Sequence, residues 1–305
     1  MLKKIKNLIA APIVRILRYK ELQKNSFFVN FIHEGNTKIL LPKLSIGELI
    51  FGYGIYAKKG FYFMGRPHVE VLLRKIIFDL YKKNYIDANN SIIDIGSSVA
   101  DNSLVWSKNL TENGKLIGID PSLDNINYSK KLSYINNLNN IDWIQAVCSE
   151  KKGDRLIIDI KPSAGAENTS FKIGSSINSL TATTLDEIIS EKKNTKIGLI
   201  HIDVEGFELK VMKGAKKIIE RDKPVLTFEQ HISKEDTSHV FKYLKNFGYR
   251  IFMINEVIPG NELDCRNFLA LHSSKEPLNF SNFDENNLKN LNIYQATIGP
   301  GLIEF

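Results

Sequence analysis

The stretch SIIDIGSSVADNS, residues 91–103, decides the fold. An apolar run ends in Asp94, Ile95 and Gly96, and small polar residues follow before a helical segment. This order predicts a buried strand, a turn and a helix, the unit from which nucleotide-binding parallel sheets are built. The turn holds one glycine where phosphate-binding turns often hold three, so an ordinary strand-to-helix turn is the alternative.

The same alternation continues along the chain. Strands alternating with helices at this spacing predict a doubly wound, mostly parallel, Rossmann-like α/β sheet, and short connections between the last strands predict an antiparallel edge. The expected helices are 68–86, 101–110, 122–137, 207–221 and 238–249, with a short helix over 179–189. The expected strands are 91–96, 115–120, 141–147, 155–160, 196–206, 224–231, 250–255 and 267–272.

We expect three parts in the chain. Residues 1–66 form an N-terminal helical and β cap with short strands within 26–33 and 37–42, residues 67–273 form the main domain, and residues 274–305 form a tail. The 305 residues are 43% hydrophobic and 25% charged, which is typical of an ordinary globular protein. With only two cysteines, a reducing cytoplasm fits best.

The basic balance of the chain, a net charge of +7, favours anionic partners. Residues 1–24 place apolar side chains at helical spacing with lysines and arginines off that stripe. Such a helix can lie at an anionic membrane surface, which would make the protein peripheral at the inner face of the membrane. The alternative is a helix packed on its own domain or on a second copy, in a homo-oligomer. A signal peptide is the weakest option.

Three acidic residues fall at the ends of predicted strands: Asp94, Asp120 and Asp203. In an open parallel sheet, ligands bind outside these carboxyl ends. Asp120 closes the second predicted strand of the sheet, so its carboxylate could take both hydroxyls of a ribose. The alternative is that aspartates start turns and cap helices there. The pair of Asp94 and Asp120, in this order around a helix, favours the ligand site.

The glycine count of the turn selects the cofactor. A dinucleotide turn needs glycines so that the backbone can approach a pyrophosphate, and residues 96–103 lack both that fingerprint and a phosphate-binding lysine. S-adenosylmethionine carries no phosphate, so a turn with fewer glycines can serve it. We therefore predict S-adenosylmethionine in preference to NAD.

Residues 199–215, LIHIDVEGFELKVMKGA, form the second dense stretch. His201, Asp203 and Glu205 would project the same way if the strand stayed extended, and each could act as the base for methyl transfer to a hydroxyl. Acids here could also hold a hard metal ion, although we assign none. For Glu205 and Glu208, charge complementing a helix N-terminus is the alternative.

Across residues 88–272 the chain resembles the FkbM-type S-adenosylmethionine-dependent methyltransferases. The resemblance rests on IIDIGSSVADNS, GKLIGIDPS, TATTLDEII, GLIHIDVEGFELKVMKGA and PVLTFEQH. It implies a methyltransferase sheet and O-methylation of sugars or other hydroxyl-bearing metabolites, often in surface polysaccharides. By this resemblance Asp203 and Glu205 lie at the reacting end. The cofactor-binding residues are expected to be Asp94, Gly96, Ser97, Asp120 and Pro121, and the substrate-binding residues Glu229 and His231.

Two positions depart from the family pattern. The family usually has a second glycine where this chain has Ala100, and commonly a lysine where this chain has His201. The Ala100 methyl either is tolerated or crowds the cofactor. His201 either acts as a base near neutral pH or is a packed residue.

We therefore predict a cytoplasmic S-adenosylmethionine-dependent O-methyltransferase acting on a sugar hydroxyl of a surface polysaccharide or glycolipid. The rival is a non-catalytic methyltransferase-fold protein that docks on a membrane or on a glycan-assembly complex. An NAD-dependent enzyme is the weakest reading. We expect no nucleic-acid partner, because no stretch interleaves aromatic and basic residues as single-strand binding does.

Overall fold

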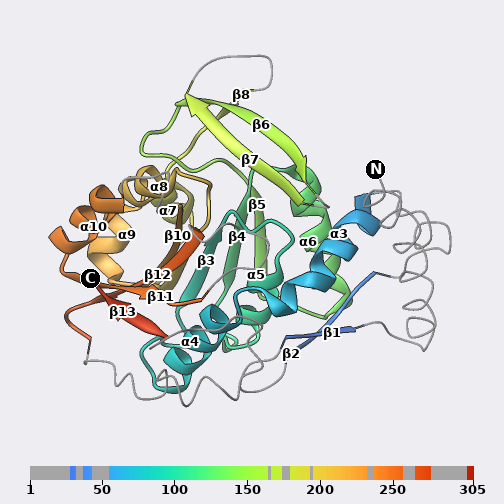
Figure 1. The fold of residues 1–305 in the computed structure, drawn as a ribbon, viewed down its shortest axis with the longest axis horizontal. Coiled ribbons are helices and arrows are strands. Elements are labelled where there is room, and N and C mark those ends of the chain that lie inside the picture. Colours follow the sequence, from blue (N-terminus) through green and yellow to red (C-terminus); the bar gives the residue numbers. More distant parts are fainter. Residues whose placement is uncertain are drawn as a thin grey trace, which may run out of the picture.

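A computed structural model describes residues 28–31, 37–42, 55–163, 166–173, 179–192, 195–231, 237–256, 265–275 and 301–305 (Figure 1). The basic helix predicted for residues 1–24 and most of the predicted tail 274–305 lie outside these ranges. In the described part of the chain, no helix is long and apolar enough to cross a bilayer.

The centre of the molecule is an eight-stranded sheet of order β13-β11-β12-β10-β9-β3-β4-β5. Five neighbouring strands are parallel: β10 Val225–His231, β9 Ile197–Ile202, β3 Ser91–Ile95, β4 Leu116–Asp120 and β5 Ile141–Gln145. From β3 the chain winds outward through β4 and β5, then returns to β9 on the other side of β3. The winding therefore reverses between β3 and β9, as predicted for a doubly wound sheet, and this is where such sheets bind ligands.

The other edge of the sheet is antiparallel, which confirms the prediction from the short final connections. β12 Cys265–His272 inserts between β10 and β11 Tyr249–Ile254 and runs antiparallel to both. A strand that the sequence did not predict, β13 Leu302–Glu304, pairs antiparallel with β11.

Helices cover both faces of the sheet (Figure 1). On one face lie α4 Val71–Lys82, α5 Asp101–Ser107 and α6 Leu123–Ile135; on the other lie α7 Leu185–Ser190, α8 Glu208–Gly214, α9 Lys216–Asp222 and α10 Thr237–Asn246. The helices α4, α5 and α6 cover the first hydrophobic core, and α7 to α10 cover the second. Neighbouring residues of β3 point to opposite faces, because Ile92 packs in the first core and Ile93 in the second. Burial on both faces explains why the parallel strands are near-continuous apolar runs.

The helix predicted over 207–221 is two helices that break at Ala215. Gly214, the last residue of α8, packs on the loop that follows β5. An added Cβ at Gly214 would be 2.1 Å from the Ser149 carbonyl oxygen of that loop. Ala215 is not helical, with φ −106° and ψ 12°, and α9 starts after it. Close packing of a glycine on another loop thus overrides the helical periodicity of the stretch.

The N-terminal part packs into the first core. β1 Phe28–Phe31 and β2 Thr37–Leu40 form the predicted short strands, as an antiparallel hairpin. Phe31 and Ile39 are fully buried in the same cluster as Trp106. An unpredicted helix, α3 Ile55–Gly65, follows, and a short 3-10 turn at Arg66–His68 leads into α4.

A second, three-stranded sheet stands apart from the central one. β6 Arg155–Ser163 pairs antiparallel with β7 Ala166–Ile173 and with β8 Ser179–Thr181. The sequence predicted the beginning of β6 but neither β7 nor β8, because residues 179–181 were expected to belong to the short helix over 179–189. In Figure 1 the β6–β7 arm lies at the top of the view, and β7 contacts α3.

Candidate active site

Acidic side chains gather where the parallel strands end. Asp94 is the penultimate residue of β3, Asp120 is the last residue of β4, and Asp203 directly follows β9. Glu229 and His231 are among the last three residues of β10. The fold thus brings these predicted residues to the carboxyl ends of neighbouring parallel strands, at the point where the winding of the sheet reverses.

Gly96 lets the loop after β3 approach the turn after β9. Its φ is +81°, and an added Cβ would lie 1.7 Å from the Asp203 carbonyl oxygen. The backbone of Asp203 in turn donates to the Ile95 carbonyl at 2.9 Å. Only glycine fits this φ value and this close distance between the two segments. The loop after β3, which is predicted to bind the cofactor, and Asp203, the predicted reacting acid, are therefore held against each other.

The loop that follows is a chain of left-handed conformations. Ser98 has φ +45° and Ala100 has φ +66°, a region that non-glycine residues rarely adopt. Ala100 is fully buried, and its side chain belongs to the first core rather than to the open side of the loop. The extra methyl therefore costs backbone strain but does not project into the space where a ligand would bind.

Asp120 organises the loop. Its Oδ2 accepts a hydrogen bond from the Ser98 backbone at 2.8 Å, and its Oδ1 accepts from the Ser122 backbone at 2.8 Å and from Asn125 Nδ2 at 3.0 Å. A carboxylate offers about four acceptor sites, so one remains for a ribose hydroxyl, and release of Ser98 would open a second. Burial raises the pKa of Asp120 to about 6 against these hydrogen bonds.

An apolar pocket adjoins Asp120. Two of the predicted cofactor-binding residues, Gly96 and Pro121, line it, together with Ile95, Ile119, Ala146, Val147, Cys148, Val204 and Phe207. The apolar side chains of this lining are of the kind that pack on a flat base, and the neighbouring Asp120 carboxylate suits the ribose. The residues present therefore fit S-adenosylmethionine. Ser97 is buried beside this pocket, and its backbone donates to the Ile119 carbonyl at 3.2 Å.

Asp94 points under the loop. Its carboxylate accepts a hydrogen bond from the Ser103 hydroxyl of α5, and its side chain is buried. Burial raises the pKa of Asp94 to about 7. Asp94 therefore links β3 to the first turn of α5.

The turn after β9 corrects one expectation. The strand does not stay extended through Glu205, because β9 ends at Ile202 and Glu205 and Gly206 take φ values of +52° and +96°. Glu205 is consequently turned out toward solvent. Glu208 closes the turn: its Oε1 accepts from the backbones of Val204 and Gly206 at 3.1 and 3.2 Å. Its Oε2 accepts from Gln230 at 3.0 Å, so Glu208 is a turn-capping residue.

His201 lies inside β9, behind Asp203. Its side chain is only 3% exposed, its Nδ1 is 2.9 Å from the Thr227 hydroxyl, and its ring meets Trp106 edge-to-face at 5.1 Å. Burial lowers the pKa of His201 to about 4. These surroundings favour the packed-residue alternative over the base, because a buried imidazole of low basicity is a poor proton acceptor.

The predicted reacting end is a cluster of carboxyl groups with one imidazole. His231 Nε2 lies 3.4 Å from Glu205 Oε2 and 3.9 Å from Glu229 Oε1. Burial and the neighbouring carboxylates, Glu229 first, raise the pKa of Asp203 well above its ordinary range. Asp203 is thus a carboxyl group with unusual affinity for a proton at the mouth of the site. Among the residues that the structure describes, no group of three or more His, Cys, Asp or Glu is arranged to hold a metal ion.

The N-terminal helix α3 adds residues that the sequence analysis did not find. The buried Lys59 donates to Asn125 Oδ1, the same side chain that contacts Asp120. In the 3-10 turn that follows α3, Arg66 Nε donates to Asp101 Oδ2 at 2.6 Å, and Arg66 Nη2 donates to Glu70 Oε2 at 2.7 Å. No local pattern in residues 55–66 signals the contacts with Asn125 and Asp101, because these partners lie far along the chain.

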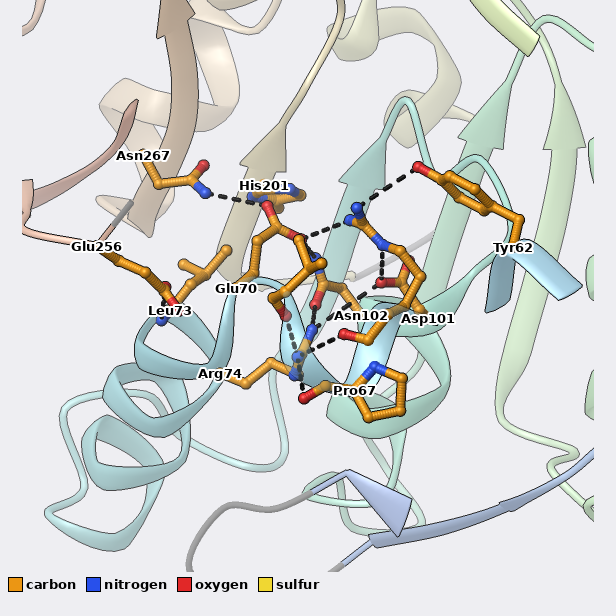
Figure 2. A network of polar contacts seen from close by, with 12 residues as sticks. Tyr62, Pro67, Glu70, Leu73, Arg74, Asp101, Asn102, His201, Glu256 and Asn267 are labelled. Atoms are coloured by element: carbon orange, nitrogen blue, oxygen red, sulfur yellow. Dashed lines mark hydrogen bonds and ion pairs between the residues drawn. The ribbon is translucent and has the colours of Figure 1, made fainter. Parts of the chain in front are cut away.

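Glu70 is the hub of a buried network (Figure 2). It precedes α4 in a left-handed conformation, φ +55°, and is 2% exposed. Besides Arg66, its carboxylate accepts from Asn102 of α5 and Asn267 of β12, each at 3.0 Å. Arg74 of α4 donates to Asn102 Oδ1 at 2.9 Å. The network therefore joins the N-terminal part, the helix after the cofactor loop and the antiparallel edge.

Comparisons with known proteins place the chain among methyltransferases. Residues 88–251 match the model of the methyltransferase FkbM domain, and no curated protein matches the chain. Among solved structures, the chain is similar to methyltransferase FkbM from Methylobacillus flagellatus KT, with 16% identity and a TM-score of 0.44. That alignment covers 60% of this chain and 44% of the other, so it spans less than half of the Methylobacillus chain.

Two further structures are similar at lower sequence identity. A SAM dependent methyltransferase from Aquifex aeolicus shares 14% identity with a TM-score of 0.36, over 65% of this chain and 97% of that one. The Streptococcus mutans protein SMU.1697c, in complex with SAH, shares 11% identity with a TM-score of 0.40, over 63% and 93%. The family match itself covers more than half of the chain and includes Asp94, Asp120 and Asp203. The chain belongs to the FkbM methyltransferase family.

Proposed function

We propose that the protein is an S-adenosylmethionine-dependent O-methyltransferase that methylates a hydroxyl of a sugar or glycan. The observation that carries the proposal is the contact between Gly96 and Asp203, which puts the cofactor loop and a proton-binding carboxyl group side by side. S-adenosylmethionine supplies an electrophilic methyl group when bound. The chain has to hold the ligand and remove one proton from the acceptor.

Asp203 is the proposed base. The acceptor hydroxyl gives its proton to the ionised Asp203 carboxylate. At the same time the hydroxyl oxygen takes the methyl group, and the bond between that methyl carbon and the sulfur of S-adenosylmethionine breaks. The raised pKa of Asp203 makes its carboxylate a stronger base than an exposed aspartate, although a smaller fraction is ionised at neutral pH. The methyl group and the hydroxyl have to be in line, which is the task of the surrounding side chains.

Glu229 and His231 are the proposed acceptor-binding residues. They lie on β10, next to β9 in the sheet, with side chains 12% and 22% exposed. With Glu205 they present several hydrogen-bonding atoms around one opening, as recognition of a polyhydroxylated ring requires. Like-charge repulsion from these carboxylates disfavours an anionic group next to the reacting hydroxyl, so neutral sugars are the preferred class.

The experiment is a turnover assay that measures S-adenosylhomocysteine formed from S-adenosylmethionine with a panel of neutral sugars and their nucleotide-linked forms. Asp203→Asn should keep binding of S-adenosylhomocysteine within about threefold and lose at least about 100-fold in turnover. His201→Gln, a change at the buried neighbour, should retain most turnover. Full turnover by Asp203→Asn would remove Asp203 from the mechanism. A protein that binds the cofactor but methylates nothing on the panel would contradict the sugar acceptor.

A non-catalytic protein with this fold is the second candidate, because Ala100 replaces a family glycine. The burial of the Ala100 methyl in the first core weighs against it.

We propose further that the acceptor belongs to a surface polysaccharide or glycolipid and that the enzyme works in the cytoplasm. Residues 1–24 would attach the enzyme to an anionic inner membrane face or to a second copy. Vesicle co-sedimentation of the full chain and of a chain lacking residues 1–24 tests the membrane contact.

A further inference from the structure

The order of the strands fixes how the proposed cofactor would lie. The apolar pocket belongs to the ends of β4 and β5, Asp120 ends β4, and Asp203 follows β9 on the far side of β3. A ligand with its base in the pocket and its ribose at Asp120 has to lay its remaining part, an amino acid, over the end of β3. There it meets the loop 96–100 and the first residue of α5, Asp101.

Arg66 stands at this place. Its guanidinium is fixed by two carboxylates, Asp101 on Nε at 2.6 Å and Glu70 on Nη2 at 2.7 Å. Within the described part of the chain, Nη1 has one long contact, 3.5 Å to the Tyr62 hydroxyl. A guanidinium has five N–H donors in a rigid fork, so donor capacity remains at the Nη1 end.

Arg66 also keeps access to solvent, which the neighbouring cations lack. The Arg66 side chain is 18% exposed, whereas that of Arg74 is 1% exposed. Arg74 is used inside the protein, with Nη2 donating to the carbonyls of Arg66, Pro67 and Val69. Lys59 is buried on Asn125. Of these three cations, Arg66 is the one that a ligand can reach.

The surroundings of Arg66 match a carboxylate partner. Two arginines, Arg66 and Arg74, face two buried carboxylates, Asp101 and Glu70, so the cluster is close to neutral, and Arg66 can donate one further charge-assisted hydrogen bond to a ligand carboxylate. Arginine bound on one edge by protein carboxylates is already oriented, so little side-chain entropy is lost when the free end meets a ligand.

We propose that Arg66 binds the carboxylate of the cofactor's amino-acid moiety, with Asp101 and Glu70 holding the guanidinium in place. The inference rests on the proposed S-adenosylmethionine site. It makes the segment before residue 88, which the family match does not include, part of the cofactor site. It also explains why a buried network should link this segment to α5 and to the antiparallel edge.

Calorimetry with two ligands tests the proposal on the full chain. The ligands are S-adenosylhomocysteine and its decarboxylated analogue, which keeps the adenosine, the thioether and the amine. The wild type should bind the first roughly 10- to 100-fold more tightly than the second, the range of a charged hydrogen bond. Arg66→Met should bind the two ligands with equal affinity, because the partner of the carboxylate is gone.

Controls separate binding from folding and from total charge. Lys58→Met removes an exposed positive charge from α3, the helix that precedes Arg66, and should keep the wild-type preference between the two ligands. Arg66→Lys keeps the charge without the fork and should retain part of the preference, so it serves if Arg66→Met does not fold. Melting temperatures are measured for every variant.

The outcomes are distinct. Equal binding of the two ligands by the wild type, or an unchanged preference in Arg66→Met, overturns the role of Arg66 and leaves the cofactor proposal standing. A folded wild type that binds neither ligand overturns both proposals. Loss of affinity for both ligands by the same factor in Arg66→Met also overturns the inference, because it marks a structural role.

Discussion

The backbone nitrogen of Ser98 donates a hydrogen bond to Asp120 Oδ2 at 2.8 Å. This contact joins the loop after β3 to Asp120, the acid that ends β4. Asp120, which is proposed to hold the ribose, therefore also holds the loop in its conformation. Ser98 has φ +45°, an unfavourable conformation that the contact helps to maintain. A ribose hydroxyl that takes over this acceptor would let the loop relax, so loop conformation and cofactor binding are coupled.

Gly96→Ala should abolish the close approach of the loop to β9. The new Cβ would lie 1.7 Å from the Asp203 carbonyl oxygen, and the residue would keep an unfavourable φ of +81°. We expect a loss of roughly 3 kcal/mol or more in the free energy of unfolding, measured by urea denaturation. Gly153→Ala is the matched control, because Gly153 has φ +87° but nothing within 4 Å of an added Cβ. It should cost only about 1 kcal/mol, and equal losses would contradict the packing argument.

Ala100→Gly tests whether the methyl group crowds the cofactor. The substitution removes a left-handed alanine at φ +66° but also removes a buried methyl group from the first core. The relief of strain and the lost burial are each about 1 kcal/mol and nearly cancel. Because the methyl group packs in the first core, its removal should leave the ligand contacts unchanged. We expect calorimetry to give an affinity for S-adenosylhomocysteine within about twofold of the wild type. A gain of tenfold or more would show that Ala100 faces the ligand after all.

His201 should make the wild type sensitive to acid. Burial lowers its pKa from 6.5 to about 4, so the unfolded chain takes up a proton at a higher pH than the folded one. The stabilisation is present above pH 6.5 and is lost as pH falls toward 4. Between pH 7 and pH 5 the unfolding free energy of the wild type should fall by roughly 2 kcal/mol more than that of His201→Gln. Parallel pH curves for the two proteins would mean that His201 has the same pKa in the folded and the unfolded chain, which would contradict the effect of burial.

Glu70→Ala should be strongly destabilising. The carboxylate is buried and accepts from Arg66, Asn102 and Asn267, and its removal leaves these donors without their acceptor. We expect a loss of roughly 3–5 kcal/mol in urea denaturation. Glu304→Ala is the control, because it breaks a pair with Arg250 in which both side chains are more than 40% exposed. That change should cost at most about 1 kcal/mol, and a similar cost for Glu70→Ala would show that the network is not required for folding.

Local signals predicted the centre of the fold. The runs that become β3, β4, β9 and β10 are apolar on both sides because helices cover both faces, and their ends can be found from the first polar residue. Asp120 and Asp203 therefore fall where the sequence analysis expected them. α3 was missed because its sequence IYAKKGFYFMG has no polar face that marks a surface helix.

Long-range contacts set the parts of the site that local patterns do not encode. Glu70 meets Asn267, which is 197 residues away, and nothing near either residue indicates the other. The outward turn of Glu205 follows from Glu208 capping the two backbone amides around it, which period-2 alternation cannot foresee. The burial of His201 depends on Trp106 and Thr227, contributed by α5 and β10.

The most direct test is calorimetric titration of the full chain with S-adenosylhomocysteine, comparing the wild type with Asp120→Ala and with Asp124→Ala. Asp124 is an exposed acid in the first turn of α6, four residues beyond Asp120, and serves as the control for lost charge. We predict one-to-one binding by the wild type, a roughly 10- to 100-fold weaker affinity for Asp120→Ala, and an affinity within about twofold of the wild type for Asp124→Ala. A folded wild type that does not bind the ligand, or an Asp120→Ala variant that binds it as tightly as the wild type, would contradict the account.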